Sequence, residues 1–146
     1  MSIDLAAKLL FSAVLVGSLP SASDVMPPRL YEVTTETAMP HLEENLRYTN
    51  TLEKRCLAHQ QLSTAFPILS HAALKGCRLD QEHRQHDTVS YVLVCEGGNG
   101  TTGSATWRIG EHQIRGNLNV KLGGKNMTFY QRVTGRALGD CEPEAR

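Results

Sequence analysis

Apolar and polar side chains alternate with a period of two through most of this chain, which is the pattern of half-buried β-strands. Residues 29–39 ("RLYEVTTETAM") show it first, with Tyr31 and Val33 on one face and Glu32 and Glu36 on the other. The same pattern predicts further strands, which we place at 51–57, from residue 77 onward, and at 88–95, 104–110, 114–122 and 125–138. The total is about seven strands.

One segment has a different period. Between residues 58 and 75 the apolar side chains recur at helical spacing, at Leu62, Phe66, Leu69 and Ala73. Pro67 lies among them, and a proline inside a helix kinks or breaks it. We therefore expect two short helical pieces, with Gly76 as the left-handed residue that ends the second.

Short polar or glycine-rich segments separate the strands. The polar residues 80–87 ("DQEHRQHD") are expected to form a hairpin turn, residues 96–103 are rich in glycine, and Gly123 with Gly124 is a two-residue hairpin signal. Strands joined in this way form antiparallel sheets. The expected fold is all-β: an antiparallel β-meander forming a barrel or half-barrel of about seven strands, with a short helical insertion.

The first 23 residues have the organisation of a secretory signal peptide. Lys8 precedes an apolar run from residue 9 to residue 19, Pro20 ends that run, and small residues lead to an expected cleavage before Asp24. The run is shorter than the roughly 20 apolar residues that span a bilayer. We expect one exported domain, residues 24–146, without stable membrane insertion after cleavage; an uncleaved anchor is the alternative.

Export gives the four cysteines a structural interpretation, because an even number in a small exported chain indicates disulfides. Cys77 and Cys95 bracket one predicted hairpin and are expected to pair, closing a loop of roughly 19 residues. Cys56, at the end of a strand, is then left to pair with Cys141, closing roughly 86 residues. The segment "TGRALGDC" therefore ends on a cysteine that ties the last strand to the first half of the chain.

Charge gives little support for a nucleic-acid partner. The chain has 15 basic and 15 acidic residues, so it has no global field that would attract nucleic acid or an anionic membrane. Residues 101–139 nevertheless carry six basic side chains against one acid, Glu111. We interpret this asymmetry as one side of an ordinary solvated surface, with a charged binding face as the alternative.

Several segments resemble the DUF3617 family of small exported bacterial proteins without an assigned activity. The resemblance is carried by "PPRLYEVTTET" near the start, by a Y-x-L-x-C strand, and most specifically by the terminal "GRALGDC". It covers residues 27–141. It implies an all-β fold and a periplasmic location, and it brings no catalytic residues to this chain.

The best candidate for metal chemistry is the predicted hairpin tip "QEHRQHD". Two histidines and two carboxylates lie close together there, and imidazole and carboxylate groups are ligands of zinc and copper. A solvated turn is the competing interpretation. The candidate ligands are Glu82, His83, His86 and Asp87.

Nothing in the sequence points to catalysis. No G-x-S-x-G segment is present, the cysteines are assigned to bridges, and the carboxylate pairs lie at positions expected to be exposed, where their pKa values are not driven apart. We expect no cofactor and no enzymatic activity.

The remaining candidate site is the apolar interior, because small barrels either fill themselves with side chains or hold one small ligand. We predict a non-enzymatic exported β-domain that binds an apolar small ligand or lipid in its interior. Two alternatives stay open: a protein-interaction module with a filled core, and a weak metal binder using the hairpin tip. The interior side chains expected to line the ligand are Tyr31, Tyr91, Trp107, Met127 and Phe129.

Overall fold

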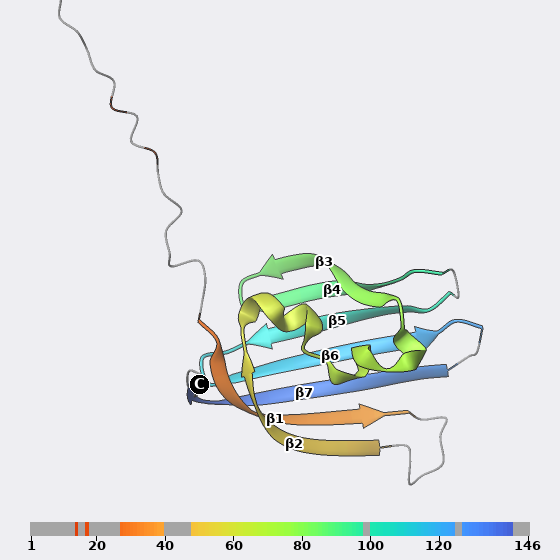
Figure 1. Ribbon diagram of the computed structural model, residues 1–146, viewed down its shortest axis with the longest axis horizontal. Helices are drawn as coiled ribbons and strands as arrows, with labels where there is room; N and C mark the ends of the chain where they lie inside the picture. Colours follow the sequence, from red (N-terminus) through yellow and green to blue (C-terminus); the bar gives the residue numbers. More distant parts are fainter. Residues whose placement is uncertain are drawn as a thin grey trace, which may run out of the picture.

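The computed structural model describes residues 27–39, 48–97, 100–124 and 127–141, together with Val14 and Gly17. Within these residues, seven strands form one antiparallel sheet and three short 3₁₀-helices lie over one of its faces (Figure 1). The strands are β1 (Arg29–Ala38), β2 (Tyr48–Leu57), β3 (Cys77–Gln85), β4 (Thr88–Cys95), β5 (Thr102–Ile109), β6 (Gln113–Leu122) and β7 (Met127–Asp140). The 3₁₀-helices are η2 (His59–Thr64), η3 (Pro67–Ser70) and η4 (Ala72–Leu74).

The strand order, β2-β1-β7-β6-β5-β4-β3, confirms the expected all-β class. Strands β3 to β7 form a meander, and the β1–β2 hairpin is added beside β7. Because β2 and β3 are the two edges and do not pair with each other, the sheet is open, as in a half-barrel. The segment that contains the 3₁₀-helices connects these two edge strands across the face of the sheet (Figure 1).

Alternation along the strands builds the core, as the sequence pattern predicts. In β6 the even-numbered positions from Ile114 to Val120 are buried and the odd-numbered ones are exposed. We call the side that carries the buried positions and faces the 3₁₀ segment the inner face. Leu62, Phe66 and Leu74 of that segment complete the core from the other side. The apolar side of the sheet is therefore covered by the chain's own insertion.

The insertion differs from the expected helical pieces. It consists of 3₁₀ turns, with extended residues at Phe66 and His71 between them. Because the chain is extended at these two residues, the direction of the side chains after each break does not follow from the helical spacing before it. Leu74 is therefore buried, and Ala73, which was expected in the core, is exposed. Gly76 has the expected left-handed backbone, with φ +79°.

The third strand is longer than its polar sequence indicates. β3 continues to Gln85, which pairs with Thr88, so the turn contains only His86 and Asp87 and the expected turn over residues 80–87 is wrong. An edge strand tolerates such a polar sequence because much of it faces water. The expected signal peptide, residues 1–23, lies outside the described residues except for Val14 and Gly17. None of the helices within the described segments has the length and apolarity needed to cross a bilayer.

Trp107 lies at the centre of the inner face and depends on a glycine beside it. It pairs across strands with Gly116, and a Cβ built on Gly116 would lie 2.8 Å from the indole ring atoms. The indole Nε1–H donates a hydrogen bond to the carbonyl oxygen of Leu62, at 3.0 Å, and the ring packs against Phe66 with 4.9 Å between centroids. Gly116 thus lets the largest core side chain reach the 3₁₀ segment.

We expect Gly116→Ala to lower the free energy of unfolding by about 1–3 kcal/mol, because the added methyl group overpacks the indole. Urea denaturation followed by tryptophan fluorescence measures this loss. Asn119→Ala, on the exposed face of the same strand, is the matched control and should change stability by less than about 0.5 kcal/mol. Equal effects of the two substitutions would contradict this account of the core.

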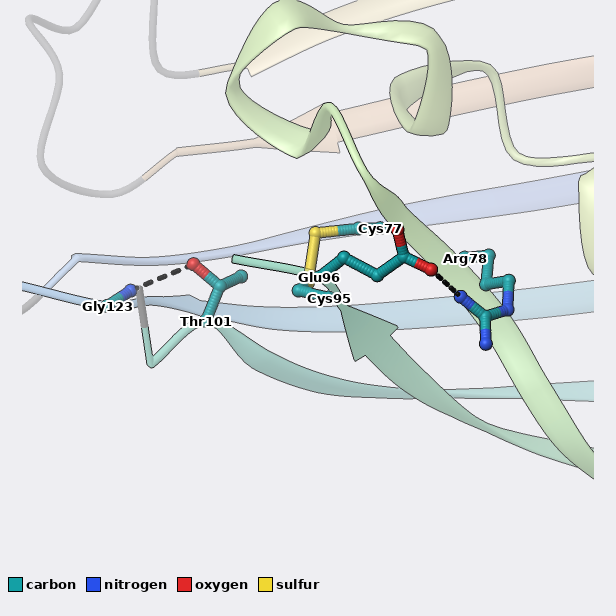
Figure 2. Close-up of a disulfide and its surroundings, with 6 residues drawn as sticks. All are labelled: Cys77, Arg78, Cys95, Glu96, Thr101 and Gly123. Atoms are coloured by element: carbon teal, nitrogen blue, oxygen red, sulfur yellow. Dashed lines mark hydrogen bonds and ion pairs between the residues drawn. A yellow bond between two sulfur atoms is a disulfide. The ribbon is translucent and has the colours of Figure 1, made fainter. Parts of the chain in front are cut away.

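Two disulfides confirm the expected pairing of the four cysteines. Cys77 and Cys95 lie directly opposite each other in β3 and β4, and beside this bridge Arg78 pairs with Glu96, with 3.1 Å between Nη1 and Oε1 (Figure 2). Cys56 of β2 bonds to Cys141, immediately after β7. Since β1 lies between β2 and β7, this second bridge reaches over the start of the first strand.

Removing the long-range bridge should destabilise the protein more than removing the local one. Loop-closure entropy assigns about 4.5 kcal/mol to the Cys56–Cys141 bridge and about 3 kcal/mol to the Cys77–Cys95 bridge. Urea unfolding of the two double Cys→Ser variants measures the difference. The opposite ranking would show that strain or denatured-state structure, not loop length, sets the contribution of these bridges.

Candidate functional site

Three of the aromatic residues expected to line a ligand are buried in the hydrophobic core at the centre of the half-barrel. Tyr31 and Trp107 are fully buried, and Tyr91 is nearly so. All three belong to a single cluster with the buried residues of the 3₁₀ segment. They are therefore core residues in this structure.

An apolar pocket remains at one end of the half-barrel, where the final turn of the 3₁₀ segment lies against the ends of β1, β6 and β7. Its volume is about 210 Å³, and it is largely enclosed. Two of the predicted ligand-lining residues, Met127 and Phe129, line this pocket. The other lining residues are Met39, Ile68, His71, Ala73, Leu74, Leu122 and Thr128.

A second, more polar hollow of about 430 Å³ adjoins the apolar pocket, and Ile68 and His71 line both. We call it the polar groove. It lies between the inner face of β1, β2 and β7 and helix η3. Its remaining lining residues are Thr35, Thr37, Thr51, Glu53, Pro67, Ser70 and Gln131.

Gln131 of β7 links two sides of the polar groove, strand β1 and helix η3. Its Nε2 donates to Thr37 Oγ1 at 2.8 Å, and its Oε1 accepts from the backbone N–H of Ile68 at 3.1 Å. The amide is almost completely buried, so both bonds are made away from solvent. This side chain fixes η3 relative to the sheet.

Thr35 is a buried polar side chain in the lining of the groove. It is only 4% exposed, and its Oγ1 has no hydrogen-bond partner within the described part of the chain. Buried hydroxyl groups are normally paired, because an unpaired one loses its bonds to water without replacement.

His71 presents one defined ring nitrogen to the two hollows. Its Nδ1 accepts a hydrogen bond from the backbone N–H of Ala73 at 3.0 Å. The neutral ring then carries its proton on Nε2, which remains a donor. His71 is the imidazole that lines both the apolar pocket and the polar groove.

A separate polar network lies near the end of β3 and explains the role of Glu82. The register of β3 against β4 shifts between Asp80 and His83, and Gln81 has a positive φ of 55°, so β3 contains a bulge. Glu82 Oε1 there accepts from Tyr91 Oη at 2.8 Å and from Arg84 Nη2 at 3.0 Å. The hydrogen bonds from Arg84 and Tyr91 lower the pKa of the Glu82 carboxyl group.

Two aromatic hydroxyl groups at this end of the core remain protonated. Burial raises the pKa of Tyr91, and its hydrogen bond to Glu82 raises that pKa further. Burial likewise raises the pKa of Tyr31, whose hydroxyl oxygen lies 3.4 Å from His59 Nε2. Burial is also the main cause of a lowered pKa of His59, with smaller contributions from Arg84 and Arg29.

The four residues expected to bind a metal are not brought together. Successive side chains of a strand point to opposite faces, so Glu82 reaches Tyr91 while its neighbour His83 does not share that side. His86 and Asp87 lie in the turn beyond β3. Among the residues that the structure describes, no group of three or more His, Cys, Asp or Glu side chains is placed to hold a metal ion.

Four exposed arginines of β5, β6 and β7 lie on the outer face of the sheet: Arg108, Arg115, Arg132 and Arg136. Arg108 of β5 stands directly opposite Arg115 of β6, and both are exposed. Arg132 stacks on Tyr130, with 4.9 Å from its guanidinium carbon to the ring centroid, and Arg136 pairs with Glu32 at 3.0 Å. Part of the charge asymmetry is therefore neutralised by an ion pair across β1 and β7.

A model of the family described as "Protein of unknown function (DUF3617)" matches residues 26–141. The chain belongs to this family. The match extends from just before β1 to Cys141 and includes all four bonded cysteines, the apolar pocket and the polar groove. No curated protein and no solved structure matches the chain.

Sequence reasoning missed most of the residues around the two hollows. Three of them, Ile68, His71 and Leu74, belong to the 3₁₀ segment, where the extended residues between the turns decide which side chains face the sheet. In the sequence, Thr35 is simply one more position on the inner face of β1. The available signal was the change from Tyr31 and Val33 to threonine along a single inner row. A polar side chain on an inner face needs either a partner or a ligand.

We expect the protein to lose stability on mild acidification through His59. The folded-state pKa of His59 is lowered, so its contribution is complete above the unfolded pKa of about 6.5 and is lost as the pH falls through the folded value. Urea unfolding at several pH values between 7.5 and 5 measures the slope. His59→Gln should flatten it, and His83→Gln, at an exposed position of β3, should not; an unchanged slope in His59→Gln would contradict the assignment.

Proposed function

We propose that this protein is an exported, periplasmic binding domain that holds the hydrocarbon part of a small amphiphilic molecule in its apolar pocket. One observation carries the proposal: a largely enclosed apolar space of about 210 Å³ at the end of the hydrophobic core. Apolar concave sites with a few polar groups at their margin are the usual form of small-molecule sites. The site thus moves from the centre of the half-barrel, where the sequence pattern put it, to its end.

The size of the pocket limits what it holds. Small-molecule sites usually have about 300–1,000 Å³, so this pocket suits one short apolar segment and not a whole lipid. Methionine side chains adapt well to flexible apolar groups, and Met39 and Met127 line the pocket from two strands. The end of an acyl or alkyl chain is therefore the proposed occupant.

The location and the absence of catalysis are parts of the same proposal. Two disulfides are typical of oxidising compartments outside the cytoplasm, which supports export. The titratable side chain at the apolar pocket is His71, and one of its ring nitrogens already accepts a backbone hydrogen bond. We therefore propose binding and not chemistry at this site.

A surface interaction is the second candidate function. Arg108 and Arg115 oppose each other on the outer face, and like charges placed directly across strands are unfavourable unless an anionic group lies between them. An acidic protein partner would supply such groups. This function would gain support if no alkyl compound entered the apolar pocket.

Ligand binding in the apolar pocket is tested by replacing Ala73, an exposed lining residue, with a larger side chain that reduces the volume of the pocket. We expect 1-octanol to give saturable shifts of the ¹³C-labelled methyl groups of Met39 and Met127 in NMR spectra. Ala73→Phe should weaken this binding at least about ten-fold, because Ala73 lines the pocket. Ala72→Phe, at the neighbouring exposed residue of η4 outside the lining, should leave it unchanged.

Ring-current shifts of the two methionine methyl groups in ligand-free Ala73→Phe show whether the new ring occupies the pocket. The proposed function is overturned if 1-octanol causes no saturable shift in the wild-type protein. It is also overturned if Ala72→Phe and Ala73→Phe weaken binding equally.

A further inference from the structure

We propose that the polar groove is the subsite for the head group of the same amphiphile, and that this head group is uncharged and hydroxylated, such as a glycerol or a sugar. The inference rests on the proposed function of the apolar pocket. It adds the chemical class of the ligand and the residues that select it.

The position of the two hollows side by side is the first observation. Ile68 and His71 line both, so the polar groove lies directly beyond these two side chains for an alkyl chain held in the apolar pocket. The change in lining is abrupt, because the apolar pocket is lined mainly by aliphatic and aromatic groups and the groove by hydroxyl, amide and carboxylate groups. Such a division fits a molecule with one apolar and one polar end.

Thr35 supplies the second, independent observation. Thr35 belongs to the lining of the groove, and its hydroxyl group is buried and lacks a partner among the described residues. Valine has nearly the same shape, and Val33 occupies the preceding inner position of β1, so a fully apolar row would fit the strand. An unpaired buried hydroxyl disfavours the empty protein, and a ligand that bonds to it removes that cost.

The charges around the groove decide which head group is compatible. Glu53 is the acidic side chain of the lining, and its carboxylate lies 3.7 Å from the Arg55 guanidinium. Among the residues that the structure describes, no lysine or arginine is part of this lining, so a carboxylate or phosphate head would gain no cationic partner from them and would meet Glu53. A cationic head would find that carboxylate already paired and half-exposed, where an ion pair contributes little.

The hydrogen-bonding groups left in the groove match hydroxyl groups on a ligand. Thr35 Oγ1 is able to donate and to accept, and His71 Nε2–H donates. Ser70 Oγ donates to the carbonyl oxygen of Pro67 at 2.8 Å and keeps its acceptor capacity. Gln131 is held in place by its bonds to Thr37 and to the backbone of η3, so the groove is preorganised for a ligand that brings both donors and acceptors.

The test compares octyl compounds that differ only in their polar end: 1-octanol, 1-octanoylglycerol, octyl β-glucoside, octanoate and octylamine. Each is titrated below its micelle concentration into the wild-type protein, with the Met39 and Met127 methyl signals as the readout. The hydroxylated compounds of this test are 1-octanoylglycerol and octyl β-glucoside, which carry several hydroxyl groups where 1-octanol carries one. At least one of them should bind about ten-fold more tightly than 1-octanol, octanoate and octylamine, which follows from one or two added hydrogen bonds.

Thr35→Val separates the head-group subsite from the apolar pocket. We expect it to weaken the binding of the hydroxylated compound roughly three- to ten-fold, to leave 1-octanol unaffected, and to raise the urea midpoint of the ligand-free protein. Thr35→Ser retains the hydroxyl group and should retain the selectivity. Thr34→Val, at the adjacent exposed position on the outer face, is the matched control and should change neither binding constant.

The failure of this inference is distinguishable from that of the proposed function. If 1-octanol binds but octanoate or octylamine binds as tightly as the hydroxylated compounds, the head-group assignment is wrong and the apolar pocket stands. The same conclusion follows if Thr35→Val weakens 1-octanol and the hydroxylated compound equally. If none of the octyl compounds moves the methionine signals, both proposals are overturned.

Discussion

The packing of Trp107 against the 3₁₀ segment is the contact on which the rest of the structure depends. An open sheet with one apolar face is not stable by itself in water, so that face must be covered. Here the indole lies on Gly116, contacts Phe66, and donates its N–H to Leu62, which joins sheet and segment at the centre of the core. The apolar pocket and the polar groove lie where the later part of this cover, from Pro67 to Leu74, meets the sheet.

The covering segment is short and irregular, and the two disulfides anchor both of its ends. Short 3₁₀ turns have poor hydrogen-bond geometry and little stability of their own. Cys56 lies just before the segment and Cys77 just after it, and each is bonded to a cysteine at or beyond the end of another strand. The bridges therefore do more than close loops: they hold the cover in place over the inner face, and with it one wall of the proposed site.

The inner-face side chains of β1 change from apolar to polar along the strand. Tyr31 and Val33 belong to the filled core, whereas Thr35 and Thr37 lie in the polar groove. Gln131 bonds to Thr37 and to the backbone of η3 and thereby links the sheet to this helix. The hydroxyl group of Thr35 has no hydrogen-bond partner among the described residues. In the proposed function, the row thus combines stability at one end with ligand selectivity at the other.

Period-two alternation and the cysteine positions determined the strands, their inner set and the Cys77–Cys95 bridge, because these features depend on neighbours in sequence and on one hairpin register. The Cys56–Cys141 bridge then followed because these two cysteines were left. The sequence also placed Met127 and Phe129 on the inner face as ligand-lining residues, and both line the apolar pocket. Only the tertiary structure decided that Tyr31, Tyr91 and Trp107 fill the centre, that a bulge turns Glu82 toward Tyr91, and that Ile68 and His71 separate two hollows. These outcomes depend on where an irregular segment meets strands distant in sequence, and no local period encodes that contact.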